Sequence, residues 1–143
     1  MSEQTPVSSN PNDRQVGGSH YRAGYQHWDL VVNNNIRYLE AQITKYVTRW
    51  RKKNGVQDVQ KSIHYLDKLQ SCLENGQLAF PEPREAKDLD QFAQENQLGD
   101  VEKTIFYLVM TYTTFDDLYR CRIVLSHLLL MAEQAEAERA KVN

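Results

Sequence analysis

Cationic and aromatic side chains recur at helical spacing between residues 38 and 68. Lys45 and Arg49 are one helical turn apart, so both side chains can reach a single anionic group. Arginine offers a planar fork that matches phosphate oxygens, and lysine offers a compact charge. The two rows are Tyr38, Gln42, Lys45, Arg49 and Lys52 or Lys53 on one segment, and Lys61, Tyr65 and Lys68 on the next. This pattern predicts a groove that binds phosphate, and a solvated basic surface is the alternative interpretation.

A short loop near the amino terminus could complete such a site. In Gly17–Tyr21 the two glycines allow a backbone to approach a ligand closely and present its N–H groups to an anion. Ser19 and His20 can donate hydrogen bonds, and Tyr21 can stack on a base. The predicted ligand-binding set is therefore Gly18, Ser19, His20, Tyr21, Trp28, Gln42, Lys45, Arg49, Lys52, Lys61 and Tyr65.

Hydrophobic periodicity predicts an all-α protein of about six helices. Apolar residues recur at three- and four-residue steps throughout, and no segment alternates as a strand would. The expected helices span about 26–33, 36–53, 56–74, 85–96, 100–112 and 115–139, and Tyr46 falls in the predicted buried stripe of the second. Val124, Leu130 and Met131 lie outside the main apolar stripe of the last helix, which predicts an oligomer contact there.

The sequence also contains an internal repeat. Residues 28–47 align without a gap on residues 90–109, at an offset of 62, and the match resumes at an offset of 59 after a shorter turn. The matched pairs are Leu30 and Phe92, Asn34 and Asn96, Glu40 and Glu102, Ile43 and Ile105, Val47 and Val109, Asp58 and Asp117, Val59 and Leu118, Leu66 and Leu125, and Leu69 and Leu128. Because a repeated helical hairpin cannot cover its own apolar face, we expect the two copies to pack on each other as one small domain.

Only the first copy carries the cations, since Tyr107 and Thr111 replace Lys45 and Arg49 in the second. We therefore expect a tail at 1–16, a basic hairpin with the ligand loop at 17–76, a linker at 77–85, and an acidic repeat for packing and oligomerisation at 86–143.

Composition sets limits on function. Residues 17–75 contain nine Lys and Arg against five Asp and Glu, whereas residues 76–143 contain seven against twelve. Anionic ligands should therefore prefer the first half, while the overall charge of −2 argues against duplex DNA. No apolar run could span a membrane, no secretory signal is visible, and two cysteines without close partners fit a cytoplasmic protein. The four histidines lack metal-ligand spacing, so we expect no metal and no cofactor.

The first half resembles a known protein family over about residues 17–70. The residues that carry the resemblance are Gly17–Tyr21, His27–Trp28–Asp29, Lys45–Tyr46, Arg49, Lys52–Lys53–Asn54–Gly55, Asp58, Lys61 and Tyr65–Leu66. They are similar to the signature of a small family from tailed bacteriophages, which is mostly of unknown function and includes a nucleotide kinase from a coliphage. Where that family has Gly-Asn, this chain has Ala41-Gln42.

Three functions remain open at the level of sequence. The first is a phage protein that binds a nucleotide, or a signal derived from one, and sequesters it as a counter-defence. The second, implied by the resemblance, is a deoxynucleoside monophosphate kinase, although the chain has neither a Gly-x-x-x-x-Gly-Lys-Ser/Thr loop nor an obvious carboxylate pair for magnesium. The third is an inhibitor that binds a host protein through the apolar surface of the last helix.

Overall fold

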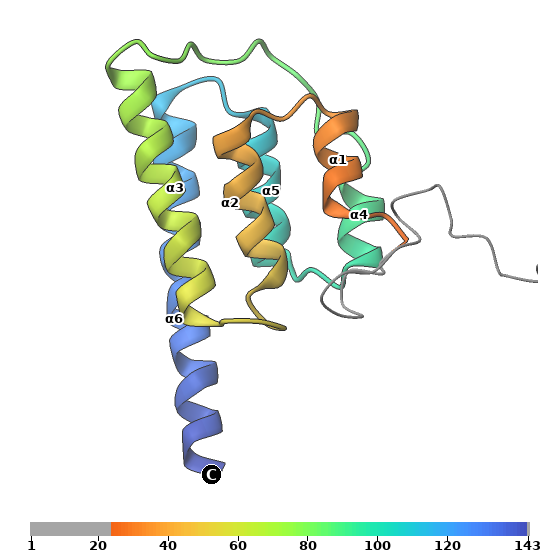
Figure 1. Cartoon of the computed structure of the whole chain (residues 1–143), viewed down its shortest axis with the longest axis vertical. Helices are drawn as coiled ribbons and strands as arrows, with labels where there is room; N and C mark the ends of the chain where they lie inside the picture. Colours follow the sequence, from red (N-terminus) through yellow and green to blue (C-terminus); the bar gives the residue numbers. More distant parts are fainter. Residues whose placement is uncertain (1–23, 143) are drawn as a thin grey trace, which may run out of the picture.

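The computed structural model describes residues 24–142, and within them six helices and no strand are present (Figure 1). The helices are α1 (His27–Asn33), α2 (Tyr38–Arg49), α3 (Val56–Glu74), α4 (Leu89–Glu95), α5 (Asp100–Thr111) and α6 (Phe115–Val142). The all-α prediction is confirmed. None of the described helices has the length and hydropathy needed to cross a membrane.

The helix boundaries reproduce the two offsets of the internal repeat. Both ends of α4 and α5 lie 62 residues after the corresponding ends of α1 and α2, and α6 begins 59 residues after α3. Six of the apolar pairs that the two offsets align are buried at both positions, from Leu30 with Phe92 to Leu69 with Leu128. Two further aligned pairs, Ile36 with Leu98 and Leu39 with Val101, are only partly buried except at Ile36. The fold is therefore two copies of one three-helix unit.

Equivalent helices of the two copies pack side by side. In Figure 1, α2 and α5 occupy the centre, α3 and α6 lie on one side of them, and α1 and α4 lie on the other. The apolar stripes converge between these pairs, so that Ile43, Val47, Ile105 and Val109 are fully buried at the centre. Burial of each stripe against the other copy supplies the hydrophobic stabilisation that one copy lacks.

Two equivalent asparagines tie the copies together. Asn34 Nδ2 donates to the carbonyl of Lys87 at 3.0 Å, and its Oδ1 accepts from the Lys87 N–H at 2.9 Å. Its counterpart Asn96 donates to the carbonyl of Tyr25 at 2.8 Å. Since Tyr25 and Lys87 are also 62 residues apart, each asparagine binds the segment that precedes the first helix of the opposite copy.

Two buried glutamates repeat this crossed arrangement. Glu40 Oε2 accepts a hydrogen bond of 2.7 Å from the hydroxyl of Tyr112, and Glu102 Oε2 accepts one of 3.2 Å from Nε1 of Trp50. Trp50 and Tyr112 are the residues that follow α2 and α5, and they correspond to each other at the 62-residue offset. Arg37 and Arg51 complete the two networks by donating to Glu40 and Glu102. These donors all reach Oε2, and Oε1 of each glutamate is buried without a hydrogen-bond partner among the described residues. The nearby guanidinium groups of Arg37 and Arg51 offset part of the cost of burying the two carboxylates.

Two helices are shorter than the sequence predicts. The periodicity predicts the second helix at 36–53, but α2 ends at Arg49, and residues 51–55 form turns that lead to Gly55 at a φ of +53°. It predicts the fourth helix from residue 85, but Asp88 adopts a left-handed conformation with a φ of +65°, and α4 begins after it. Apolar periodicity does not report such backbone conformations, since they depend on contacts made by the folded chain.

Candidate functional site

Three cationic side chains from two helices surround one aromatic ring. Lys45 Nζ lies 5.5 Å from the centroid of the Tyr46 ring, Arg49 Cζ lies 5.2 Å from it, and Lys61 Nζ lies 5.2 Å from it. All three distances are within the range of cation–π attraction. We call Lys45, Tyr46, Arg49 and Lys61 the Tyr46 cluster. The antiparallel hairpin of α2 and α3 therefore brings Lys45 and Arg49 of one predicted row to the same place as Lys61 of the other.

The local sequence explains this convergence. Lys45 and Arg49 occupy adjacent turns of α2, so they lie on one side of the helix. On α3, Ser62 directly follows Lys61 and is fully buried. Its hydroxyl donates to the carbonyl of Ile43 at 2.9 Å, which fixes the distance and register between the two helices beside the cluster.

A buried carboxylate holds one of the three cations. The side chain of Asp58 is 0% exposed, and its Oδ2 lies 3.4 Å from Nε of Arg49. The same oxygen accepts the backbone N–H of Asn54 at 3.0 Å, so it also closes the turn that precedes α3. Within residues 24–142, Lys45 and Lys61 form no ion pair, and the cluster therefore keeps two uncompensated positive charges.

Aromatic rings continue from the cluster toward the beginning of α2. Tyr65 stacks on Tyr46 with centroids 5.9 Å apart, and Tyr38 meets Tyr65 edge-on at 6.5 Å. Burial raises the pKa of Tyr65, and the neighbouring Tyr38 raises it further. At neutral pH these rings therefore offer π faces and hydroxyl groups, which suit a base or a sugar.

His27 fastens α1 to α2 beside the cluster. Its Nε2 lies 2.8 Å from the hydroxyl oxygen of Thr44, which itself donates to the carbonyls of Glu40 and Ala41. The hydroxyl has one proton, so His27 Nε2 carries the hydrogen in this contact. Burial lowers the pKa of His27 to about 4, with a further contribution from Lys45. A neutral imidazole is consistent with a role in packing.

The internal repeat relates three predicted site residues to a cavity. A cavity of about 600 Å³ lies between α4 and α5, and its lining includes Asp90, Thr104 and Tyr107. Their counterparts at the 62-residue offset are Trp28, Gln42 and Lys45 in the first copy. These three residues therefore occupy the equivalent positions on α1 and α2, and Trp28 is 49% exposed.

The remaining predicted residues do not all join the cluster. Tyr65 contacts it through the Tyr46 ring, whereas Lys52 lies exposed in the turn that follows α2. The loop residues Gly18, Ser19, His20 and Tyr21 lie outside the described residues. In the part of the chain that the structure covers, no group of three or more His, Cys, Asp or Glu side chains is placed to hold a metal ion.

Sequence reasoning misses two members of the site. Periodicity places Tyr46 in the buried stripe of its helix, but the residue is only partly buried and lies at the centre of the cations. The sequence signal that could have identified Tyr46 as a site residue is its position next to Lys45 and three residues before Arg49. The sequence suggests a helix-start residue at Asp58, and the contact of this residue with Arg49 across the turn has no signature in the sequence.

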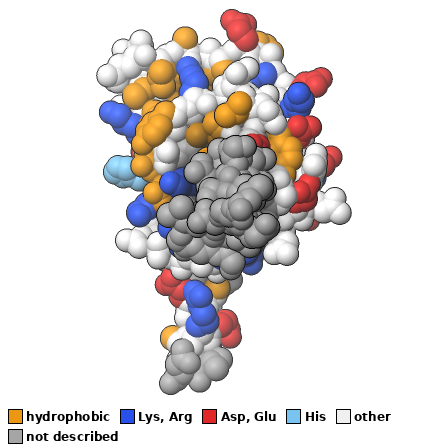
Figure 2. All heavy atoms as spheres, turned by 45° about the vertical axis from the view of Figure 1, so that its right-hand side comes forward, with side chains coloured by type: hydrophobic (Ala, Val, Ile, Leu, Met, Phe, Trp, Pro, Cys, Tyr) orange, Lys and Arg blue, Asp and Glu red, His pale blue; other side chains and the backbone are white. Residues whose placement is uncertain are grey.

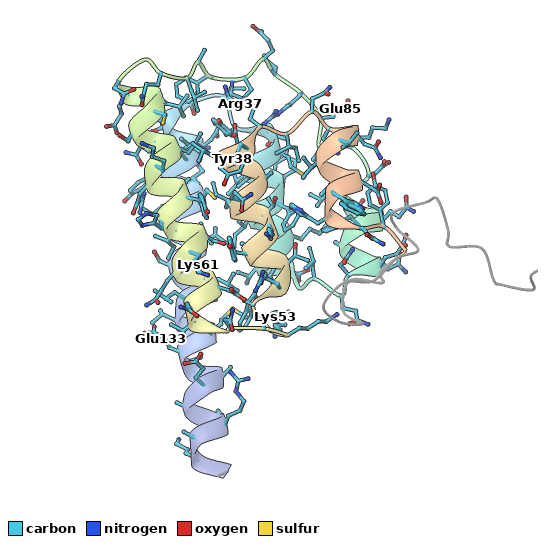
Figure 3. The ribbon with its side chains drawn as sticks, in the orientation of Figure 1. Arg37, Tyr38, Lys53, Lys61, Glu85 and Glu133 are labelled. Atoms are coloured by element: carbon cyan, nitrogen blue, oxygen red, sulfur yellow. The ribbon has the colours of Figure 1, made fainter. Side chains whose placement is uncertain are left out.

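Acidic and basic side chains are unevenly distributed over one face of the molecule. In the view of Figure 2, acidic side chains gather along one margin of the described surface, and lysine and arginine are more frequent toward the opposite margin. Figure 3 places Tyr38 high on α2 and Lys61, a member of the Tyr46 cluster, lower on α3.

Comparison with known proteins gives one match. Residues 17–67 match the family described as a protein of unknown function (DUF3310). The matched segment contains α1, α2 and the first part of α3, and with them the whole Tyr46 cluster and Asp58. No curated protein matches the chain. No solved structure matches it either.

Proposed function

We propose that this protein binds a nucleotide, or another phosphate-bearing small molecule, through the Tyr46 cluster. The observation that carries the proposal is the convergence of Lys45, Arg49 and Lys61 on one ring, with Asp58 as the carboxylate that pairs with one of them. Phosphate oxygens are the natural partners of such a set, because they accept charge-assisted hydrogen bonds from both lysine and arginine.

Partial burial makes this cluster a better anion site than an exposed basic surface. Lys45, Arg49 and Lys61 are all partly buried, and each is attracted to the electron-rich face of Tyr46. Charges that are partly removed from water attract an anion more strongly than fully solvated ones. The cluster therefore has an electrostatic reason to recruit a ligand.

The biological role that we propose is sequestration. The protein would act in the cytoplasm of a bacterial host during phage infection and withhold a nucleotide-derived signal from the host defence. Its phage setting rests on the resemblance of residues 17–70 to the tailed-phage family, and binding without turnover requires only the cations, donors and rings described above.

Calorimetric titration tests this proposal. Pyrophosphate and a panel of mono-, di-, tri-, cyclic and dinucleotides are titrated into the full chain. We expect at least one nucleotide to bind, and we expect Lys45→Met and Arg49→Met each to weaken binding about tenfold or more. Lys141→Met, at the exposed end of α6, is the matched control and should bind as the parent does. Absence of binding by every compound would refute the proposal.

The same preparations distinguish binding from catalysis. Each deoxynucleoside monophosphate is incubated with a nucleoside triphosphate and magnesium, and products are separated by anion-exchange chromatography. Unchanged nucleotides are expected for a sequestering protein. Diphosphate formation that disappears in Lys45→Met would instead assign the nucleotide kinase activity.

We further propose that the chain self-associates through α6. Of the residues that the sequence predicts for this contact, Leu130 is 57% exposed, whereas Val124 and Met131 are partly buried against the core. Tyr119 and Ile123 are 64% and 53% exposed and lie with Leu130 on the outer face of the helix. Their counterparts on α3 at the 59-residue offset are the polar residues Gln60, His64 and Ser71. The same face is thus polar in one copy and apolar in the other, which favours a partner for α6.

The charges of α6 favour a second copy of the same helix as that partner. In an antiparallel pair that aligns Ile123 with Leu130, Arg120 falls opposite Glu133 of the other subunit. Both apolar and ionic contacts are then made twice, as a two-fold symmetric interface requires. A different host protein on this face is the alternative, and the oligomeric state in solution decides between them.

A further inference from the structure

A second, smaller cavity lies at the far end of the tyrosine row. It has a volume of about 260 Å³ and is located where the first turn of α2 meets the end of α3. Its lining combines apolar and polar side chains and includes Arg37, Tyr38, Glu40 and Lys68. Pockets that enclose a whole small molecule usually measure about 300–1,000 Å³, so this cavity is suited to one end of a larger ligand.

The row of rings connects this cavity to the Tyr46 cluster. Tyr38 lines the cavity, its ring centroid lies 6.5 Å from that of Tyr65, and Tyr65 lies 5.9 Å from Tyr46. Tyr38 is 67% exposed, so much of its ring is open to a ligand. Figure 3 shows the two ends of this path, with Tyr38 near the start of α2 and Lys61 farther down α3.

The two ends differ in charge. At the cavity, the guanidinium of Arg37 forms an ion pair with Glu40 at 3.0 Å and donates a hydrogen bond to the hydroxyl of Tyr112. Lys68 is then the cation at the cavity that forms no ion pair among the described residues. The Tyr46 cluster keeps Lys45 and Lys61 uncompensated. The stronger anion site and the exposed ring are therefore separated by two ring-to-ring steps.

We infer that the ligand is a nucleoside polyphosphate, with its base against Tyr38 at the small cavity and its terminal phosphates in the Tyr46 cluster. This inference rests on the proposed function and assigns a direction to the bound ligand. Two ring-to-ring steps separate the base from the cations, which a chain of two or three phosphates spans more readily than a single phosphate. The two uncompensated lysines match a ligand with more than one negative phosphate group.

The test compares ligands with and without a base in matched variants. Pyrophosphate, a nucleoside monophosphate, a diphosphate and a triphosphate of the same base are titrated into the parent, Tyr38→Ala and Tyr38→Phe. Stacking of a base on an aromatic side chain accounts for roughly a tenfold change in affinity when that side chain is removed. Tyr107→Ala removes an exposed tyrosine from α5 of the second copy and is the control.

We expect the di- and triphosphates to bind more tightly than the monophosphate. Tyr38→Ala should weaken the nucleotides about tenfold and leave pyrophosphate unchanged. Tyr38→Phe should bind as the parent does, because the phenylalanine ring still stacks. Unchanged nucleotide affinity in Tyr38→Ala would overturn the placement of the base, and so would an equal loss for pyrophosphate and nucleotides. Failure of the parent to bind either class would overturn the proposed function itself.

Discussion

The carboxylate of Asp58 lies 3.4 Å from Nε of Arg49, whereas its repeat counterpart Asp117 has Thr111 at the position equivalent to Arg49. Both aspartates accept a backbone N–H from four residues earlier, Asp58 from Asn54 and Asp117 from Thr113. The turn bond therefore belongs to the shared architecture of the repeat. The ion pairs differ, because Asp58 faces an arginine at the end of the preceding helix, whereas Asp117 pairs with Arg120 of its own helix at 3.3 Å. Only the contact in the first copy positions a cation of the candidate site.

This difference predicts unequal costs for two equivalent substitutions. Asp58→Asn removes a buried charge that faces Arg49, and it should lower the free energy of unfolding by about 2–3 kcal/mol. Asp117→Asn keeps an oxygen for the turn bond at a partly exposed site and should cost about 1 kcal/mol or less. Urea denaturation of both variants measures the difference. Equal losses would show that the ion pair with Arg49 contributes nothing to stability.

The buried imidazole of His27 predicts a pH dependence of stability. Its pKa is lowered to about 4 in the folded protein, from an ordinary value of about 6.5. Between these values the unfolded chain binds a proton that the folded chain does not. Stability should therefore fall as the pH falls from about 6.5 to about 4, by no more than about 3 kcal/mol.

The repeat supplies the control for this prediction. Leu89 occupies the position equivalent to His27 in the second copy, so His27→Leu is a substitution that the fold already accepts elsewhere. Thermal melts from pH 7 to pH 4 should show a flatter profile for His27→Leu than for the parent. Parallel profiles would mean that other groups cause the acid sensitivity.

The turn before α3 predicts coupling between Gly55 and Glu136. Gly55 has a φ of +53°, and a Cβ there would lie 2.6 Å from Oε1 of Glu136. That oxygen accepts the N–H of Val56 at 3.1 Å and so caps the start of α3 from the projecting end of α6. Gly55→Ala should lower the free energy of unfolding by about 2 kcal/mol, through backbone strain and loss of this cap.

A double-mutant cycle separates the two causes. In a Glu136→Ala background the cap is already lost, so Gly55→Ala should cost about 1 kcal/mol less than in the parent. Gly76→Ala is the control. Gly76 has a φ of +80°, and no neighbouring atom lies within 4 Å of the position that an alanine Cβ would take. Backbone strain is therefore the only cost of this substitution that the geometry predicts. Additive effects of Gly55→Ala and Glu136→Ala would argue against the coupling.

The antiparallel α6 pair predicts a change of mass in solution. The parent should elute as a dimer in size-exclusion chromatography with light scattering, and Ile123→Lys should elute as a monomer. His64→Lys changes the equivalent position on α3 and should remain a dimer. Glu133→Arg should weaken the dimer, and adding Arg120→Glu should restore it. A monomeric parent at all concentrations would eliminate this interface.

Apolar pattern is sufficient to predict most of the fold. The stripes that contain Ile43 and Ile105 predict the correct helices, and the offsets of 62 and 59 residues correctly pair the buried positions. The cations of the site are also accessible to sequence reasoning, because Lys45 and Arg49 lie one turn apart and Lys61 lies on the neighbouring helix of a tight hairpin.

The polar interior is not predictable from periodicity. Glu40 and Glu102 are as polar in sequence as any exposed glutamate, and they are buried because Tyr112 and Trp50 reach them from the opposite copy. The prediction of Tyr46 as a core residue is wrong, since a partly buried ring beside cations and a fully buried ring have the same spacing along a helix. Such distinctions depend on contacts between segments distant in the chain.

The crossed hydrogen bonds have a practical consequence for how this protein should be produced. The family match stops at residue 67, within α3, yet Glu40 depends on Tyr112 and Asn34 depends on Lys87. A fragment cut at the edge of the match would expose polar and apolar groups that the native chain keeps covered. The segment that matches the family and the segment that folds as a unit therefore differ in length, and the longer one should be expressed.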